Sequence, residues 1–407
     1  MSTEATAKKT RAANAGGRIP VLALGTGISL LGVLRALSRS NVDVFALREV
    51  DRATRRSRWY RPVSPDLAGV APENLAQRLN ALPPGTVLIP CADSWARAVA
   101  ALPAELRAKY PASIAPLAAI DLFVDKGKFG RALDRLQLPH PKTRLLTSLA
   151  DLASVPDTDL EDGFLKPIHS QQFFAHFGVK AYRVAGRADA ETRLKSCLDA
   201  GFHMMLQEYV RGPATSHYFV DGFVDRHGEI TGLFARRRIR MSPPDFGNST
   251  FMISVPLEEV TSAVSTLRTL LADVNYRGIF SAELKRDERD GAFNLIEVNA
   301  RAWWYVDFAA RCGVNVCEMA IADALERPVP HVTGFAVGRR CVFPYYDIAA
   351  VRAERSAGRL GLIGWAGSWL GSYQPVFRWA DPLPAIGEVV ALGFQRFRKS
   401  VRSRRRS

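Results

Sequence analysis

The chain lacks a long uninterrupted apolar segment, although hydrophobic residues make up 47% of its 407 residues. The best candidate, residues 21–37, is broken by glycines and by Arg35, whereas a membrane-spanning helix needs about 20 consecutive apolar residues. Residues 1–17 are polar, small and basic, without the apolar core of a secretory signal. We therefore expect no transmembrane helix, and we expect residues 1–17 to form a disordered leader.

Cysteine and histidine are scarce, with 5 and 7 residues, and they are scattered along the chain. Only Cys312 and Cys317 lie near each other, at a spacing that fits neither a zinc knuckle nor a redox dithiol. This scarcity excludes a disulfide-rich scaffold and gives no histidine a metal-binding or catalytic role. Free thiols are typical of a reducing compartment, so we expect a cytoplasmic protein.

Acidic residues are the minority, with 40 Asp and Glu against 55 Lys and Arg, and the formal net charge is +15. Such an excess invites a nucleic-acid or membrane interpretation. Much of it is local, however, in residues 236–240 and in the last dozen residues. We therefore do not expect nucleic acid as a partner, and each basic cluster needs its own explanation.

The most informative stretch is residues 280–301, which reads as two strands joined by a polar Asp-Gly turn. Glu283 lies on the first strand, and Glu297, Asn299 and Arg301 lie on one face of the second, because side chains alternate along a strand. Two carboxylates and an amide oxygen are hard ligands that suit Mg²⁺. The alternative is a solvated hairpin, but the apolar neighbours favour a metal site: Leu295, Ile296, Val298, Trp303, Trp304 and Tyr305.

Residues 18–116 follow a strand, glycine turn, helix and strand pattern, which predicts an α/β domain with a parallel sheet. Gly25 and Gly27 resemble the first two glycines of a dinucleotide fingerprint, but Leu30 occupies the third position. A tight turn at a helix N-terminus, binding any anion or none, is an equal alternative.

Residues 117–330 alternate antiparallel strands and helices, which is typical of an α+β domain, and the last helix is predicted over 306–325. Within it, Arg236, Arg238 and Arg240 share one strand face and are expected to face the site.

The remaining residues, 331–407, form a predicted extension in which 358–371 look irregular and 386–401 form a basic amphipathic helix. That helix could contact an anionic membrane or dock on the protein, and the two alternatives stay open.

Five short motifs follow one another in order: Asp125-Lys126, Lys166-Pro167, Gln207–Gly212, Glu283-x-Lys285 and Glu297-x-Asn299-x-Arg301. In this order the chain resembles the ATP-grasp superfamily over about residues 20–330, and particularly its carboxylate–amine ligases, such as carbamoyl phosphate synthetase and D-amino acid ligases. The lid after Lys166 departs from the glycine-rich family pattern, and no acid follows Gly212 where the family usually contacts ribose.

The resemblance implies a role for each matching residue. It assigns Glu283, Glu297 and Asn299 to Mg²⁺, with Mn²⁺ as a substitute, and it assigns catalytic roles to Arg301, Lys285 and Arg238. It also implies an ATP site made of seven residues: Lys126, Lys166, Lys180, Gln207, Glu208, Tyr209 and Val210.

The implied enzyme is an ATP-dependent ligase that activates a carboxylate as an acyl phosphate for attack by an amine. One alternative is a bicarbonate-activating enzyme of the carboxylase or carbamoyl-phosphate type. Another is a catalytically weak ATP-grasp protein that binds a membrane or nucleic acid through its basic tail. A homodimer, and peripheral contact with the inner membrane surface, are further expectations.

Overall fold

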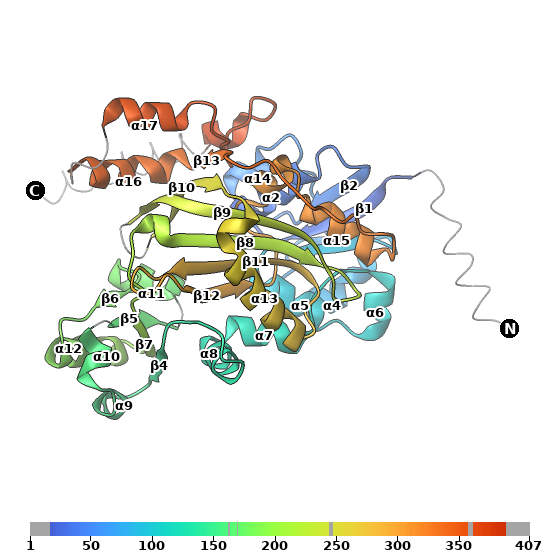
Figure 1. The fold of residues 1–407 in the computed structure, drawn as a ribbon. Coiled ribbons are helices and arrows are strands. Elements are labelled where there is room, and N and C mark those ends of the chain that lie inside the picture. The colour runs from blue at the N-terminus through green and yellow to red at the C-terminus, as the bar shows by residue number, and fades with distance from the viewer. Residues whose placement is uncertain (1–16, 162, 169, 244–246, 357–360, 388–407) are drawn as a thin grey trace, which may run out of the picture.

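The computed structural model describes residues 17–387, apart from 162, 169, 244–246 and 357–360. It contains a three-stranded parallel sheet, a four-stranded antiparallel sheet and a six-stranded antiparallel sheet (Figure 1). This arrangement confirms the predicted combination of an α/β N-terminal part with antiparallel sheets and helices. The predicted leader, except for Gly17, and all but the first two residues of the predicted helix 386–401 lie outside the described residues. Within the described part, no helix is long and apolar enough to cross a membrane.

The parallel sheet has the strand order β2-β1-β3 and opens the fold, as the βαβ pattern predicted. It consists of β1 (Ile19–Leu24), β2 (Val42–Ala46) and β3 (Val87–Pro90), and α2 (Gly27–Ala36) follows β1. Gly25 has a φ of +149°, and a Cβ placed on it would lie 2.8 Å from the Cβ of Cys91. The glycine is therefore required by close packing of β1 against the end of β3.

Five helices and three 3₁₀ turns complete this part. The helices are α3 (Arg52–Arg55), α4 (Leu75–Arg78), α5 (Asp93–Ala100), α6 (Ala104–Lys109) and α7 (Leu117–Val124), and the 3₁₀ turns are η1 (Pro65–Leu67), η2 (Pro72–Asn74) and η3 (Leu79–Ala81).

The six-stranded sheet forms the centre of the molecule, with the strand order β12-β11-β8-β9-β10-β13. Its strands are β8 (His217–Val224), β9 (Ile230–Ser242), β10 (Asn248–Ser254), β11 (Gly278–Arg286), β12 (Phe293–Asn299) and β13 (Arg340–Val342). Alternate side chains enter different cores: Val220 packs in the core that includes α13 (Thr261–Asp273), whereas Phe219 and Phe223 pack towards the N-terminal part. Both faces of the sheet are thus covered over part of their length.

The helix predicted over 306–325 is two helices, α14 (Val306–Cys312) and α15 (Val316–Ala324). Gly313 separates them with a φ of +113°, a left-handed conformation that ends a helix and that glycine adopts without steric cost. The apolar periodicity continues through the break, so the sequence pattern alone did not reveal it.

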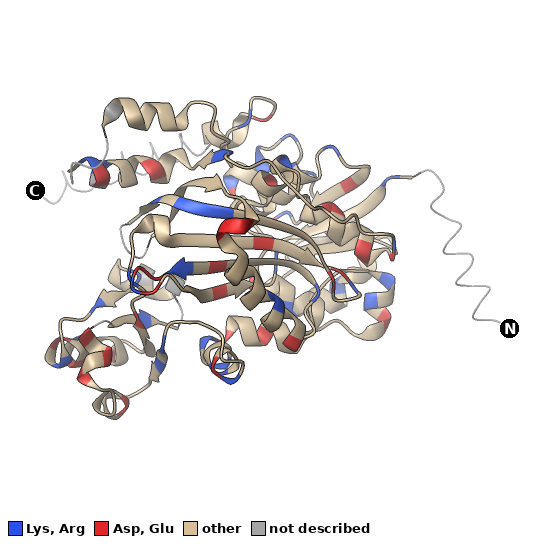
Figure 2. Ribbon diagram, viewed as in Figure 1, with Lys and Arg blue, Asp and Glu red and all other residues tan. Residues whose placement is uncertain are grey.

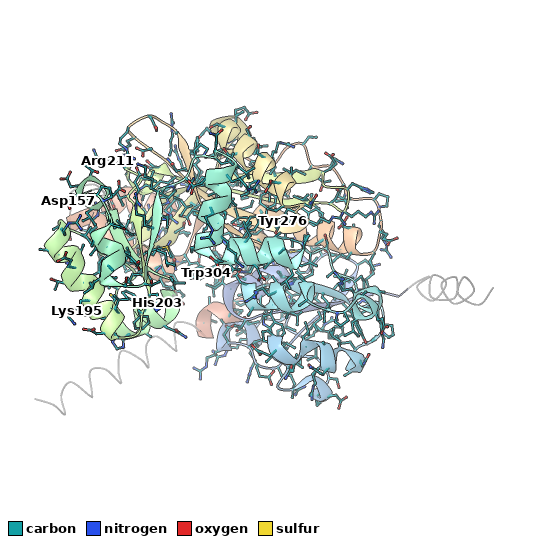
Figure 3. The ribbon with its side chains drawn as sticks, turned by 90° about the horizontal axis from the view of Figure 1, so that it is seen from below. Asp157, Lys195, His203, Arg211, Tyr276 and Trp304 are labelled. Carbon is teal, nitrogen blue, oxygen red and sulfur yellow. The ribbon has the colours of Figure 1, made fainter. Side chains whose placement is uncertain are left out.

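The four-stranded sheet, in the order β4-β7-β5-β6, belongs to a separate lobe at the lower left of Figure 1. Its strands are β4 (Thr143–Leu146), β5 (Gly163–Pro167), β6 (Tyr182–Arg183) and β7 (Met204–Glu208). Helix α8 (Lys126–Arg135) leads into the lobe, and the other helices are α9 (Leu149–Ala153), α10 (Asp157–Glu161), α11 (Ser170–Phe177) and α12 (Arg187–Asp199). Asp157 and Lys195 lie on the outer side of the lobe, away from Tyr276 (Figure 3). The lobe therefore turns its sheet, rather than these helices, towards the rest of the protein.

The extension carries α16 (Pro344–Ser356), which lies above β9 and β10 in Figure 1, and α17 (Leu362–Trp369). The prediction that 358–371 is irregular is wrong for α17, where Trp365 and Trp369 lie one turn apart with ring centroids 5.0 Å apart. Asp347 on α16 is fully buried and accepts hydrogen bonds from Arg240 at 2.7 and 2.8 Å. This ion pair fixes the extension to the central sheet.

Two glycine-to-alanine substitutions should have opposite effects on stability. A Cβ on Gly222 in β8 would lie 2.5 Å from the carbonyl oxygen of Gly232 and 2.8 Å from the ring of Phe280. Gly222→Ala should therefore lower the free energy of unfolding by about 1–3 kcal/mol. A Cβ added to Gly130 in α8 would have no atom within 4 Å, so Gly130→Ala should raise the free energy of unfolding by about 0.5–1 kcal/mol. Urea unfolding of the two variants measures both, and equal effects would contradict the packing described for β8.

Candidate functional site

A cavity of about 320 Å³ lies between the four-stranded and six-stranded sheets. Its walls come from β5 and β7 on one side and from β8, β9, β11 and β12 on the other. Ten of the thirteen residues that the sequence assigned to the site line it: Lys166, Lys180, Gln207, Glu208, Tyr209, Val210, Arg238, Glu283, Lys285 and Glu297. The fold thus gathers residues from four of the five sequence motifs around one space.

The two acids of the cavity face each other across neighbouring strands, because Glu283 on β11 pairs directly with Glu297 on β12. The register shifts just beyond this pair, so that Leu284 faces Leu295 and Ile296 becomes an extra residue in β12. Like charges directly opposite each other on one sheet face are destabilising unless cations compensate them. The acidic pair therefore needs positive partners, and the cavity supplies them.

Arg238 compensates the charge of Glu283, and His217 forms a hydrogen bond with it. The Arg238 guanidinium donates to the Glu283 carboxylate at 3.0 Å, and His217 Nδ1 lies 2.9 Å from Glu283 Oε1. Burial and the nearby Arg238 together lower the pKa of His217 to about 4, so the imidazole is neutral near pH 7 and donates its N–H. Burial alone would raise the pKa of Glu283, but Arg238 and His217 hold it well below its ordinary value. Glu283 is consequently an ionised carboxylate.

Lys126 compensates Glu297 from outside the cavity wall. Its Nζ lies 3.3 Å from Glu297 Oε2, and this cation lowers the pKa of the carboxyl. Asn299, two residues further along β12, donates to Glu297 Oε1 at 3.3 Å, so the predicted trio of Glu283, Glu297 and Asn299 is contiguous. The described residues hold no group of three or more His, Cys, Asp and Glu placed to bind a metal ion. A site here would need the amide oxygen of Asn299 or ligand oxygens, and the metal assignment stays a prediction.

Three lysines of different elements point into the same space. Lys166 on β5 is half-buried, and burial and the neighbouring Lys126 lower its pKa. Lys180, before β6, donates to the side-chain oxygen of Asn248 at 2.9 Å, and burial also lowers its pKa. Lys285 is only 4% exposed, with its Nζ 4.3 Å from the ring centroid of Tyr209. Together they make the cavity strongly attractive to an anion such as a polyphosphate.

The segment from Gln207 to Val210 forms the edge of the cavity at the end of β7. The Glu208 carboxylate accepts from Arg289 at 2.6 Å, and Arg289 also binds Asp287 in the loop between β11 and β12. The ring of Tyr209 lies against Arg183, with the guanidinium carbon 3.8 Å from the ring centroid. The two sheets are therefore bridged at this edge, beside residues that the resemblance assigned to the ATP site.

Arg301 lies outside the cavity lining and contacts the N-terminal part of the chain. Its Nε donates to Asp93 Oδ1 at 2.8 Å, and another guanidinium nitrogen donates to Asn299 at 3.1 Å. Strand β12 ends at Asn299, so the alternation that put Arg301 beside Glu297 stops before it. Asp93, at the start of α5, was not identified from the sequence.

The basic strand β9 appears as a blue band in Figure 2, yet only one of its arginines lines the cavity. Arg236 donates to the buried Asp221 at 2.6 Å, and Arg240 is bound to Asp347. The expectation that all three alternate arginines face the site is therefore wrong for Arg236 and Arg240. Arg236 and Arg240 form structural ion pairs, and Arg238 is the arginine of β9 that lines the cavity.

Sequence reasoning missed His217, Asn248 and Arg289. His217 pairs with Lys285 across β8 and β11, so the strand register would have placed it beside the acids. Asn248 and Arg289 come from loops or strand ends, where no periodicity indicates the direction of a side chain.

No family model matches the chain. It is 20% identical over 245 residues to the D-aspartate ligase of Enterococcus faecium, a match that spans 58% of this chain and 58% of that protein. The chain thus spans less than two thirds of this curated relative.

Solved structures are similar over more of the chain. The L-amino acid ligase of Bacillus licheniformis matches with a TM-score of 0.53 and 17% identity, over 76% of this chain and 75% of that one. The biotin carboxylase domain of Hydrogenobacter thermophilus 2-oxoglutarate carboxylase, solved with MgADP and bicarbonate, matches with a TM-score of 0.59 and 15% identity, over 79% and 73%. These likenesses, with the sheet topology, confirm the predicted ATP-grasp fold.

Proposed function

We propose that the protein is an ATP-dependent carboxylate–amine ligase that binds MgATP between its two antiparallel sheets. The observation that supports this most is the meeting of the Glu283–Glu297 pair with Lys166, Lys180 and Lys285 around one cavity. The similarity to D-aspartate ligase and to L-amino acid ligase supports an amino acid as one of the two substrates. Domain limits of 18–116, 117–330 and 331–407 are part of this proposal.

Each group of residues in the site has its own role in the proposed reaction. Lys126, Lys166 and Lys180 would hold the phosphates, while the backbone of Tyr209 and Val210 would contact the adenine. Glu283, Glu297 and Asn299 would hold Mg²⁺, or Mn²⁺, which screens charge between phosphate oxygens when bound. Arg238 and Arg301 would stabilise negative charge as the substrate carboxylate attacks the γ-phosphorus. ADP leaves as the acyl phosphate forms, and an amine then attacks the acyl carbon, loses a proton and displaces phosphate.

A bicarbonate-activating enzyme is the second candidate, because the Hydrogenobacter carboxylase domain shares the fold and was solved with bicarbonate. A catalytically weak ATP-grasp protein with a basic tail is the third. Homodimer formation and peripheral membrane contact remain parts of the proposal that gel filtration and liposome binding can test.

A hydroxylamine assay should separate these candidates. Purified protein with ATP, Mg²⁺ and single amino acids should release ADP and phosphate only with the correct acid. Hydroxylamine should convert the acyl phosphate into a hydroxamate of that acid, which mass spectrometry identifies. Turnover with bicarbonate alone would favour the carboxylase, and absence of turnover with a broad acid panel and with bicarbonate would contradict both enzymes.

A further inference from the structure

A second cavity, of about 680 Å³, shares no lining residue with the cavity between the sheets. It is formed where segments far apart in the sequence meet: Arg39 after α2, Trp59 in the N-terminal part, Arg311 on α14, and 369–380 of the extension. Neither the proposed ligase reaction nor its residues require this space.

The wall of this cavity is positively charged. Three arginines line it, Arg39, Arg311 and Arg378, and no acidic residue does. The carboxylate nearest to two of them is the buried Asp307, which lies 3.7 Å from Arg311 and 3.7 Å from Arg378. Asp307 thus forms long ion pairs with both arginines, and it also accepts a hydrogen bond from the hydroxyl of Tyr373. One carboxylate beside three arginines leaves the wall with a net positive charge.

Arg378 has unused hydrogen-bonding capacity. Its Nε and one terminal nitrogen are buried without a hydrogen-bond partner in the described part of the chain. The guanidinium is held against the ring of Trp59, 5.0 Å from the ring centroid. Buried donors without acceptors are rare and costly, and an anion that reached these two nitrogens would satisfy them.

Aromatic and apolar side chains complete the lining. Trp379 is 90% exposed, with its ring against the edge of Phe377, and Leu370 is 77% exposed. Large apolar side chains that stand in water beside a charged cavity mark a surface that becomes covered when a ligand binds. The combination fits a ligand with an anionic head and an apolar body.

We propose that this second cavity binds the phosphate of a phosphate ester whose apolar body lies on Leu370 and Trp379. Arginine forks match phosphate oxygens in pairs, and Arg311 and Arg378 come from different elements that converge on one point. Such an ester could be the headgroup of an anionic phospholipid or a soluble molecule. The inference is independent of the proposed ligase activity.

The test uses the full-length protein and two probes. Phosphatidylcholine vesicles with and without phosphatidylglycerol, followed by co-sedimentation, test the lipid source, and calorimetry with phenyl phosphate tests the soluble source. Binding of either probe should weaken by at least about tenfold in Arg378→Gln, because charge-assisted hydrogen bonds are lost. The intrinsic tryptophan emission should shift to the blue on binding in the wild type, and much less in Trp379→Ala.

Arg107→Gln is the matched control, since Arg107 is exposed on α6 and the same charge is removed. Every variant keeps residues 388–407, so a contribution of these residues to vesicle binding is the same in all variants and cancels when the variants are compared. Arg311→Gln, half-exposed, serves if Arg378→Gln fails to fold. Vesicle binding that is lost in the cavity variants assigns a lipid, and phenyl phosphate binding assigns a soluble ester. No binding of either probe, or equal binding by Arg107→Gln and the cavity variants, would overturn the proposal.

Discussion

Glu297→Gln should reduce substrate-dependent ADP release on the order of 100-fold or more, while the protein stays folded. The substitution keeps the shape of the side chain and removes the charge that faces Glu283 and contacts Lys126. Under the proposed function it removes a Mg²⁺ ligand, so the residual activity should require a higher Mg²⁺ concentration. Initial rates measured over a Mg²⁺ titration give both quantities.

The stability of this variant gives an independent check. Glu297 stands directly opposite another carboxylate, but Lys126 outweighs that repulsion and lowers the pKa of Glu297, so the ionised carboxylate stabilises the folded protein. The unfolding midpoint should therefore fall slightly, because both side chains of the ion pair are partly exposed. Glu105→Gln, on the exposed surface of α6, should change neither rate nor stability. If Glu297→Gln retains wild-type turnover and Mg²⁺ dependence, the metal assignment is wrong.

Asp381→Asn should lower the free energy of unfolding by about 3–5 kcal/mol, because it leaves a buried arginine without its counter-ion. Arg35 and Asp381 are 1% and 2% exposed, and their side chains are joined at 3.0 Å. Asp381 also accepts from the Ser57 hydroxyl at 2.7 Å and from the backbone N–H of Arg58 at 2.9 Å. The loss should appear in urea unfolding and as faster hydrogen exchange in 375–381.

The matched control is Asp199→Asn on α12. Its partner is Lys195 at 2.8 Å, but both side chains are more than half exposed. Exposed pairs of this kind contribute about 0.3–0.5 kcal/mol, so the control should be nearly as stable as the wild type. Similar stabilities for the two Asp→Asn variants would show that the extension is not held by the buried pair.

The sequence predicted the parts of the site that depend on local alternation. Glu283 and Glu297 were placed on neighbouring strands because the apolar and polar residues alternate and a turn joins them. The sequence could not predict that Glu283 and Glu297 stand directly opposite each other. Their pairing depends on the strand register, which shifts by one residue at Ile296. Hydrophobic patterning fixes which face a side chain takes, whereas a bulge is set by the backbone of both strands.

Long-range partners account for most of the remaining errors. Arg236, Arg238 and Arg240 do share one face of β9, but Asp221 and Asp347 bind the outer two from 15 and 107 residues away. Arg301 is bound by Asp93, 208 residues earlier in the chain. Such contacts depend on how separate elements pack, and one sequence contains no periodic signal for them. The break at Gly313 is different, since a glycine within an apolar helix pattern was visible but ambiguous.

The contact between Lys126 and Glu297 has a consequence for the order in which ligands bind. The Lys126 ammonium cannot pair with the Glu297 carboxylate and with a nucleotide phosphate at the same time. In the same way, the Glu297 carboxylate cannot bind both Lys126 and a divalent cation at full strength. Under the proposed function, nucleotide binding draws the ammonium away and exposes the carboxylate to the metal. The two ligands should consequently be thermodynamically coupled, each raising the affinity for the other by the same factor. Under the proposed function, Lys126 is an internal cation that neutralises Glu297 in the free protein until a nucleotide phosphate replaces the carboxylate as its partner.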